Sequence, residues 1–213
     1  MEIRAYDEAY LASARNILGH AADFAIMTLN LDPDDFGKAL MVSEASKQFA
    51  AGNPRYVAGM NGCELARQVL SETGTSYNDA EDVMYIDKSP EYWAGWALAH
   101  YQWQSSRSFM DILSAVAFSR IIEMYPVFHE MDVTQFTDHM NGIMRKSYPV
   151  SRLKVQRINN SMSPEDLAEA SGIELRDILL LEEKEKDINS IAAINLLRLS
   201  RALHCGMEDL IEL

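Results

Sequence analysis

The sequence has few cysteines and no long apolar run. Cys63 and Cys205 are its only cysteines, and they stand far apart without the spacing of a metal-ligand pair. We therefore expect two reduced thiols, as is typical of a cytosolic protein. No stretch approaches the roughly 18 consecutive apolar residues of a membrane span, and Met1–Asp7 lacks the charged and apolar regions of a signal peptide. These absences predict a cytoplasmic protein without a membrane partner.

Positive charge is also scarce. The chain has 19 Lys and Arg residues against 32 Asp and Glu residues, which gives a formal net charge of −13. Strong acidity favours solubility and disfavours non-specific binding to nucleic acids or membranes. DNA binding would therefore have to depend on a local feature of the chain.

The motifs of enzymes and metal sites are missing as well. The glycine-containing segment 52–62 is followed by Cys63-Glu64, whereas a phosphate loop ends in Gly-Lys-Ser or Gly-Lys-Thr. His129-Glu130 lacks the second histidine that the zinc-protease pattern requires. The histidines form no ligand cluster visible in the sequence: His20, His100, His129, His139 and His204. We predict a protein with no enzymatic activity, no catalytic residue, no cofactor and no metal.

The sequence does contain helical periodicity and clear helix starts. Asp32-Pro33 and Ser89-Pro90 each place a capping residue before a proline, which is the pattern of a helix N-terminus. Apolar spacing and caps predict helices over 5–29, from 33 onward, over 63–71, from 90 onward, over 108–124 and over 133–145. Within the polar connection 74–88, Val83–Ile86 is predicted as a short strand.

Residues 146–151 form the predicted domain boundary, because Pro149 breaks the preceding helix. The boundary divides the chain into an N-terminal helical domain, residues 1–148, and a C-terminal domain, residues 149–213. The predicted fold class is all-α. We interpret the first domain as a dimerisation or partner-binding domain.

The C-terminal domain shows five predicted helices. They cover 153–158, the segment after Ser163-Pro164, 175–183, 189–203 and a short stretch after Gly206. Ser163 caps the second helix and Asp166 completes a capping-box pattern, while Gly172 ends that helix in a left-handed turn. A helix, a tight turn with glycine and a second helix form the helix-turn-helix pattern.

This pattern is specific enough to indicate a family. The residues that carry it are 163–173, Ile178, Leu181, Glu182, 196–203 and 208–211. They resemble the lambda-repressor/Cro-type (XRE-like) helix-turn-helix family. The resemblance implies a five-helix DNA-binding domain in which Ile178 and Glu182 are buried. It also implies that the helix after Gly172 enters the major groove.

The positions that would contact DNA depart from the family pattern. Pro164 stands where the family usually has a glutamine. The helix after Gly172, which would read the bases and which we call the reading helix, begins with Glu174-Leu175-Arg176-Asp177. Because base edges are read chiefly by Arg, Lys, Asn and Gln, Arg176 is the credible base contact. The predicted DNA-binding set is Arg152, Lys154, Arg157, Ser163, Leu175, Arg176, Leu179 and Lys184. The four other basic residues of this set, which are Arg152, Lys154, Arg157 and Lys184, would contact phosphates.

The reading helix also presents leucines outward. In the family geometry Leu175, Leu179 and Leu180 face away from the core, and an exposed apolar patch indicates a binding or covered surface. Three interpretations stay open. The leucines pack on the first domain or a second copy of the chain, dock a protein partner, or contact thymine methyl groups beside Arg176.

An aromatic face marks the N-terminal domain. Trp93, Trp96, His100 and Trp103 fall on one side of a helix. Such a face is a buried core stripe or a dimer seam, since aromatics dominate cores and interfaces. The alternative is a pocket for a base, a peptide or a small ligand. Around it, residues 52–59, 64–66 and 92–103 look like a module found upstream of helix-turn-helix domains in toxin–antitoxin-like bacterial regulators.

These observations favour a bacterial DNA-binding transcriptional regulator, an autoregulator or antitoxin of a toxin–antitoxin-like operon. A homodimer is expected, because operators are commonly bound by two-fold dimers. The alternative is a non-enzymatic protein-interaction module whose degenerate helix-turn-helix does not bind DNA. Sensing of a small molecule by the aromatic face is a third interpretation.

Overall fold

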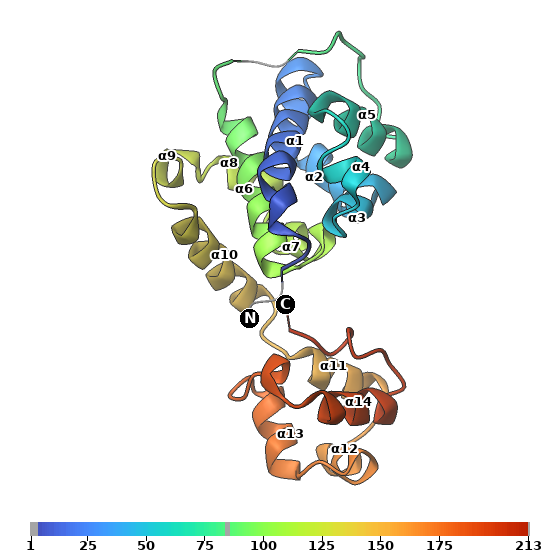
Figure 1. Cartoon of the computed structure of the whole chain (residues 1–213). Coiled ribbons are helices and arrows are strands. Elements are labelled where there is room, and N and C mark those ends of the chain that lie inside the picture. The colour runs from blue at the N-terminus through green and yellow to red at the C-terminus, as the bar shows by residue number, and fades with distance from the viewer. Residues whose placement is uncertain (1–3, 84–85, 213) are drawn as a thin grey trace. The chain divides into compact units, whose positions relative to one another are not determined.

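The computed structural model describes residues 4–83 and 86–212, and across these residues it is helical without any strand. This confirms the all-α prediction. The chain folds into two compact units, Met1–Arg145 and Lys146–Leu213, which we call unit 1 and unit 2 (Figure 1).

Unit 1 is a bundle of α-helices and short helical turns. Its predicted helix starts are confirmed: Asp32 accepts the backbone N–H groups of Asp34 and Asp35, and Ser89 accepts that of Tyr92. The elements are η1 (Glu8–Tyr10), α1 (Leu11–Asp23), η2 (Phe24–Thr28), α2 (Pro33–Val42), α3 (Glu44–Ala50), α4 (Pro54–Val57), α5 (Gly62–Thr73), α6 (Pro90–Ser105), α7 (Phe109–Ala115), α8 (Phe118–Ile122), α9 (Tyr125–Phe128) and α10 (Val133–Ser147).

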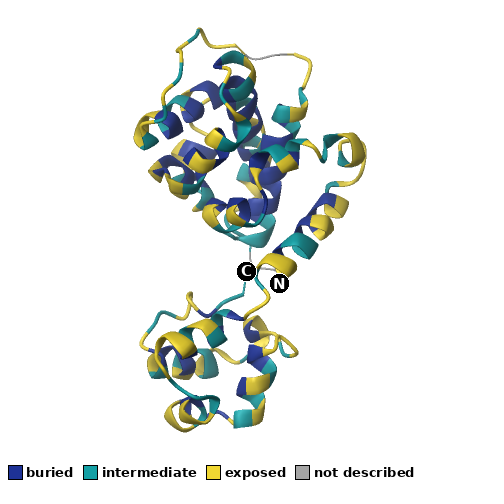
Figure 2. Ribbon diagram, turned by 180° about the vertical axis from the view of Figure 1, so that it is seen from behind, coloured by how far each residue is buried: buried dark blue, intermediate teal, exposed yellow. Residues whose placement is uncertain are grey.

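The centre of unit 1 is the packing of α1 against α6 and α5. The backbones of α1 and α6 approach closely at Gly95, where a Cβ atom would overlap the carbonyl oxygen of Leu18. At Gly19 on α1, a Cβ atom would lie 2.8 Å from the ring of Tyr92 on α6. Figure 2 shows the buried residues concentrated inside this bundle. The close approach therefore depends on residues without side chains at the contact.

Two predicted elements of unit 1 differ from the structure, and a third falls partly outside the described residues. The first helix begins at Leu11 rather than residue 5, because Asp7 caps a separate 3-10 turn, and it continues as a π-helical turn after Asp23. The predicted helix 108–124 is broken at Val116, whose backbone is extended, and becomes α7 and α8. The predicted strand Val83–Ile86 falls partly on residues 84–85, which lie outside the described residues.

Unit 2 packs short helices around one apolar core. Its elements are α11 (Arg152–Asn159), α12 (Pro164–Ser171), α13 (Leu175–Glu182), η3 (Ile188–Ser190) and α14 (Ala193–Ala202). Its core residues are Leu153, Leu167, Ile173, Ile178, Leu181, Ile188, Leu199, Leu203 and Leu210. Every α-helix of the unit contributes to this core.

Two predictions about unit 2 need correction. The predicted helix 189–203 begins only at Ala193, since Asp187 caps the short 3-10 turn η3 before it. The predicted fifth helix after Gly206 is a turn, in which the Asp209 carboxylate accepts the backbone N–H of Gly206 and Leu210 is buried. Among the described residues, unit 2 thus has four α-helices rather than five.

Candidate functional site

The predicted helix, tight turn and helix are present as α12 and α13. Ser163 Oγ accepts the backbone N–H of Asp166, and the backbone N–H of Ser163 donates to Asp166 Oδ2 at 2.8 Å, which confirms the capping box. These hydrogen bonds lower the pKa of Asp166. Gly172 ends α12 with φ of +67°, in the left-handed conformation that favours glycine. Only Ile173 and Glu174 then separate the turn from α13.

A buried ion pair fixes α13 to α11. Arg157 donates to both carboxylate oxygens of Glu182, at 2.5 and 2.8 Å, and to the carbonyl oxygen of Met162 at 2.7 Å. The exposed fractions of the two side chains are 10% and 2%. Arg157 therefore belongs to the interior of unit 2 rather than to the predicted phosphate-contact surface, because reaching a phosphate would leave Glu182 buried without its partner.

The other predicted phosphate contacts lie at the surface but carry carboxylate or backbone partners. Lys154 Nζ lies 2.8 Å from Glu183, and Lys184 Nζ lies 3.2 Å from Glu212. The Glu212 carboxylate also accepts the backbone N–H of Arg152. Exposed ion pairs contribute only about 0–1 kcal/mol. A phosphate can therefore replace these carboxylates at small cost, but the acidic groups stay nearby.

The outward face of α13 follows the sequence prediction in its burial pattern. Ile178 and Leu181 are buried, Leu179 is 44% exposed, and Leu175 and Leu180 are only partly exposed. Arg176 is exposed, and among the described residues no carboxylate lies within ion-pair distance of its guanidinium. The nearest acidic residue in sequence, Asp177, instead pairs with Lys186 at 3.0 Å. Arg176 is thus available at the start of α13.

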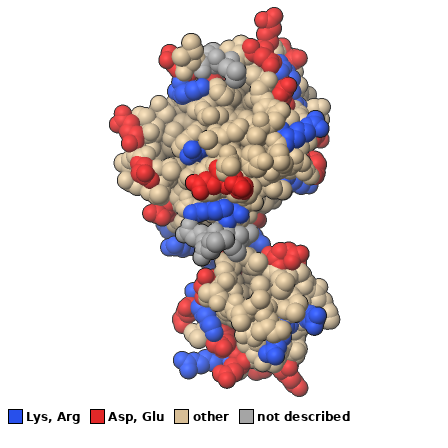
Figure 3. Space-filling view, viewed as in Figure 1, with Lys and Arg blue, Asp and Glu red and all other residues tan. Residues whose placement is uncertain are grey.

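Charge on unit 2 is mixed. Unit 2, residues 146–213, contains 9 basic and 12 acidic side chains, a balance of 9 − 12 = −3. On the face seen in Figure 3, basic and acidic side chains of unit 2 alternate and form no continuous basic surface. This face therefore offers no broad basic patch of the kind that supplies non-specific DNA affinity.

The aromatic face of α6 divides into a buried part and an accessible part. Trp103 and His100 are each 7% exposed, and Trp103 Nε1 donates to the carbonyl oxygen of Tyr6 at 2.8 Å. Burial, reinforced by the charge of Arg15, lowers the pKa of His100 to about 4. Trp93 and Trp96 are only half-buried. The predicted core stripe describes the first pair, whereas the second pair borders a cavity.

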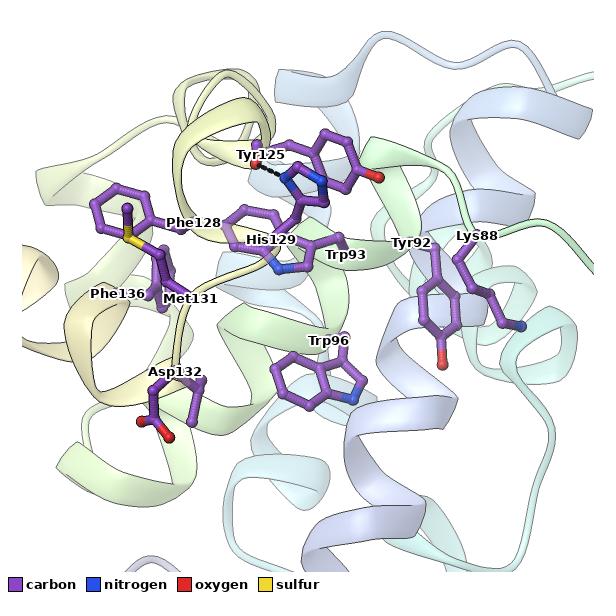
Figure 4. A pocket seen from close by; sticks show the side chains of 11 residues that line it. Lys88, Tyr92, Trp93, Trp96, Tyr125, Phe128, His129, Met131, Asp132 and Phe136 are labelled. Atoms are coloured by element: carbon purple, nitrogen blue, oxygen red, sulfur yellow. Dashed lines mark hydrogen bonds between the residues drawn. The ribbon is translucent and has the colours of Figure 1, made fainter.

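The cavity is an aromatic pocket of about 500 Å³ in unit 1. We call it the aromatic pocket; its lining residues are Lys88, Tyr92, Trp93, Trp96, Tyr125, Phe128, His129, Met131, Asp132, Val133 and Phe136 (Figure 4). Trp93 and Trp96 are predictable from their helical spacing, whereas the wall from residues 125–136 is not. No local signal connects the two segments, which lie about 30 residues apart and meet only through folding.

Neither similarity to known proteins nor a metal-binding or membrane-spanning feature of the described residues indicates a function. The chain matches no family model, no curated protein and no solved structure. Within residues 4–83 and 86–212, no group of three or more His, Cys, Asp or Glu side chains is placed to hold a metal ion. No helix in this part of the chain combines the length and apolar character needed to cross a bilayer.

Proposed function

We propose that the protein is a DNA-binding transcriptional regulator that inserts α13 into the major groove. The availability of Arg176 carries this proposal, because it is the only basic residue of α13 and is exposed at the end that would meet the bases. The turn at Gly172 and the buried pair of Arg157 with Glu182 hold α13 firmly against the rest of unit 2. A rigid reading helix is what sequence-specific recognition needs.

In this mechanism Arg176 reads a guanine through its O6 and N7 acceptors. Leu175 and Leu179 lie on the same outward face and would contact thymine methyl groups. Arg152, Lys154 and Lys184 would contact phosphates, the two lysines by exchanging Glu183 and Glu212 for phosphate oxygens. A homodimer on a two-fold operator, and autoregulation of a toxin–antitoxin-like operon in a bacterium, extend the proposal by resemblance of sequence.

A second candidate function is favoured by the paired cations. Lys154, Arg157 and Lys184 all face carboxylates of the same unit, and Leu179 leaves an apolar side chain exposed on α13. These features suit a helix that contacts another protein instead of DNA. The protein would then be a non-enzymatic interaction module with a helix-turn-helix architecture.

Fluorescence anisotropy with the DNA upstream of the protein's own gene tests the first proposal. We expect specific binding that weakens by about 10- to 100-fold in Arg176→Ala, the effect of losing one good base contact. Arg198→Ala is the matched control, since Arg198 is exposed on α14 and the same charge is lost. Both variants should bind an unrelated DNA equally.

The salt dependence separates the two functions further. The logarithm of the association constant should fall with the logarithm of the salt concentration, with a slope near −0.9 per phosphate contacted. Because few phosphates are contacted, we expect a shallow slope. If the upstream DNA and an unrelated DNA bind equally weakly even at low salt, the proposal of sequence-specific DNA binding is wrong. The second proposal, a protein-interaction module, then replaces it.

A further inference from the structure

The aromatic pocket has a pre-formed wall. The Trp93 ring meets the rings of Tyr125 and Phe136 edge to face, with centroid distances of 5.8 and 5.4 Å. This geometry is favoured for aromatic pairs. Because Phe136 is itself buried in unit 1, it holds the indole of Trp93 in place. The ring is therefore oriented before any ligand arrives.

Trp96 forms the adjacent wall and is supported from within the unit. The guanidinium of Arg15 lies 4.5 Å from the centre of its ring, and the His100 ring is parallel to it within 9°. Both contacts are favourable for an electron-rich indole. Trp96 nevertheless stays half-buried at the edge of a cavity of about 500 Å³. That volume falls in the range of pockets that bind small molecules.

The charged residues of the pocket lie at its ends. Figure 4 shows Lys88 and Asp132 on opposite sides of the two tryptophans. Lys88 Nζ lies 4.2 Å from the centre of the Tyr92 ring and 3.3 Å from His20 Nε2. Asp132 Oδ1 accepts two hydrogen bonds from Thr134 at the start of α10. The space between them is lined mainly by aromatic and apolar side chains.

The indole N–H groups of Trp93 and Trp96 both line this space, and within the described residues neither donates a hydrogen bond. The two differ in direction, and Trp93 Nε1 faces the space between the rings (Figure 4). In Figure 4 this nitrogen is on the ring edge that is turned toward Trp96. An indole N–H that becomes buried normally acquires an acceptor. A ligand that fills the pocket would therefore have to supply an acceptor oxygen.

We propose that the aromatic pocket binds a flat aromatic small molecule carrying a carbonyl or carboxylate oxygen. Its ring would lie among Trp93, Trp96 and Phe128, and its oxygen would accept the hydrogen bond of the Trp93 indole. The site is contained in unit 1 and uses no residue of α13. It is therefore independent of the proposed DNA contact.

Isothermal titration calorimetry of the full-length protein tests the ligand class with three probes. Indole-3-acetate provides a flat ring and a carboxylate, cyclohexylacetate keeps the carboxylate on a saturated ring, and tetramethylammonium is a cation without an acceptor. We expect saturable one-to-one binding of indole-3-acetate and at least tenfold weaker binding of cyclohexylacetate. Equal binding of these two acids, binding of tetramethylammonium alone, or no saturation by indole-3-acetate at millimolar concentration overturns the proposal.

Variants locate the binding in the pocket. Trp93→Phe keeps an aromatic ring but removes the N–H, so the affinity for indole-3-acetate should fall about tenfold, as for the loss of one hydrogen bond. Trp96→Leu should abolish measurable binding. Val127→Ala is the control, because Val127 is exposed on α9 and outside the lining. With circular dichroism showing all variants folded, unchanged affinity in both tryptophan variants would overturn the assignment.

Discussion

Breaking the buried pair of Arg157 with Glu182 should destabilise unit 2 far more than breaking an exposed ion pair of the same unit. The Glu182→Ala variant leaves the guanidinium of Arg157 buried and without its counter-charge. Breaking a buried ion pair in this way costs about 3–5 kcal/mol. Lys154→Met, which breaks the exposed pair with Glu183, should cost no more than about 1 kcal/mol. The contrast follows from burial, since both pairs have short distances.

Removing both partners should restore most of that loss. In the double variant Arg157→Met with Glu182→Leu, no charge remains buried and apolar side chains fill the space. The carbonyl oxygen of Met162 loses the hydrogen bond from Arg157, which costs about 1 kcal/mol. The double variant should therefore lie within about 2 kcal/mol of the wild type, and above both single variants in stability.

The assay has to observe unit 2 specifically. Native-state hydrogen exchange of the full-length chain, followed along a urea series, reports the opening free energies of amides in α11 and α13. Amides in α5 of unit 1 serve as an internal reference. A cost below about 1 kcal/mol for Glu182→Ala, or a double variant as unstable as the sum of the single variants, would refute the description of this pair as buried and mutually dependent.

Three further predictions concern other parts of the chain. Gly95→Ala should lower the melting temperature of unit 1, because the new Cβ overlaps the backbone of α1, whereas Gly142→Ala on α10 meets nothing within 4 Å and should stabilise by about 0.5–1 kcal/mol. The pKa of His100 is about 4 in the folded state, below its unfolded value near 6.5. Protons therefore favour the unfolded state, and stability should be full above pH about 6.5 and fall toward pH about 4. Thermal unfolding followed by tryptophan fluorescence should show this loss in the wild type and a smaller one in His100→Gln; parallel pH profiles would contradict it. Ser163→Ala should destabilise unit 2 by about 1 kcal/mol through loss of the cap on α12, measurable by the same hydrogen exchange, and no change in α12 amides would argue against the cap.

The sequence predicted helix ends best where a single side chain determines them. Asp32, Ser89 and Ser163 were assigned as caps because their hydrogen bonds involve only the next few residues, and the structure confirms each one. Gly74 and Gly172 likewise end α5 and α12 in left-handed turns. Such signals are local and need no knowledge of the rest of the fold.

The prediction failed where tertiary packing overrides periodicity. Residues 108–124 have the apolar spacing of one helix, yet the extended backbone at Val116 redirects the chain so that both Ile112 and Phe118 are buried. The role of Arg157 was also hidden, because a basic residue on a short helix looks exposed until its distant partner Glu182 is placed. The aromatic pocket was predictable only in part for the same reason: its second wall comes from a separate segment.

The contact of α1 with α6 restricts how the gene can vary at one codon. Every single-base change that replaces glycine introduces a residue with a Cβ atom, and at Gly95 that position is taken by the carbonyl oxygen of Leu18. No single-base change at the Gly95 codon therefore yields another residue that fits this contact. The codon of Gly142, whose surroundings are open, should vary freely among functional variants, so a library of random single mutants should be depleted at the first codon and not at the second.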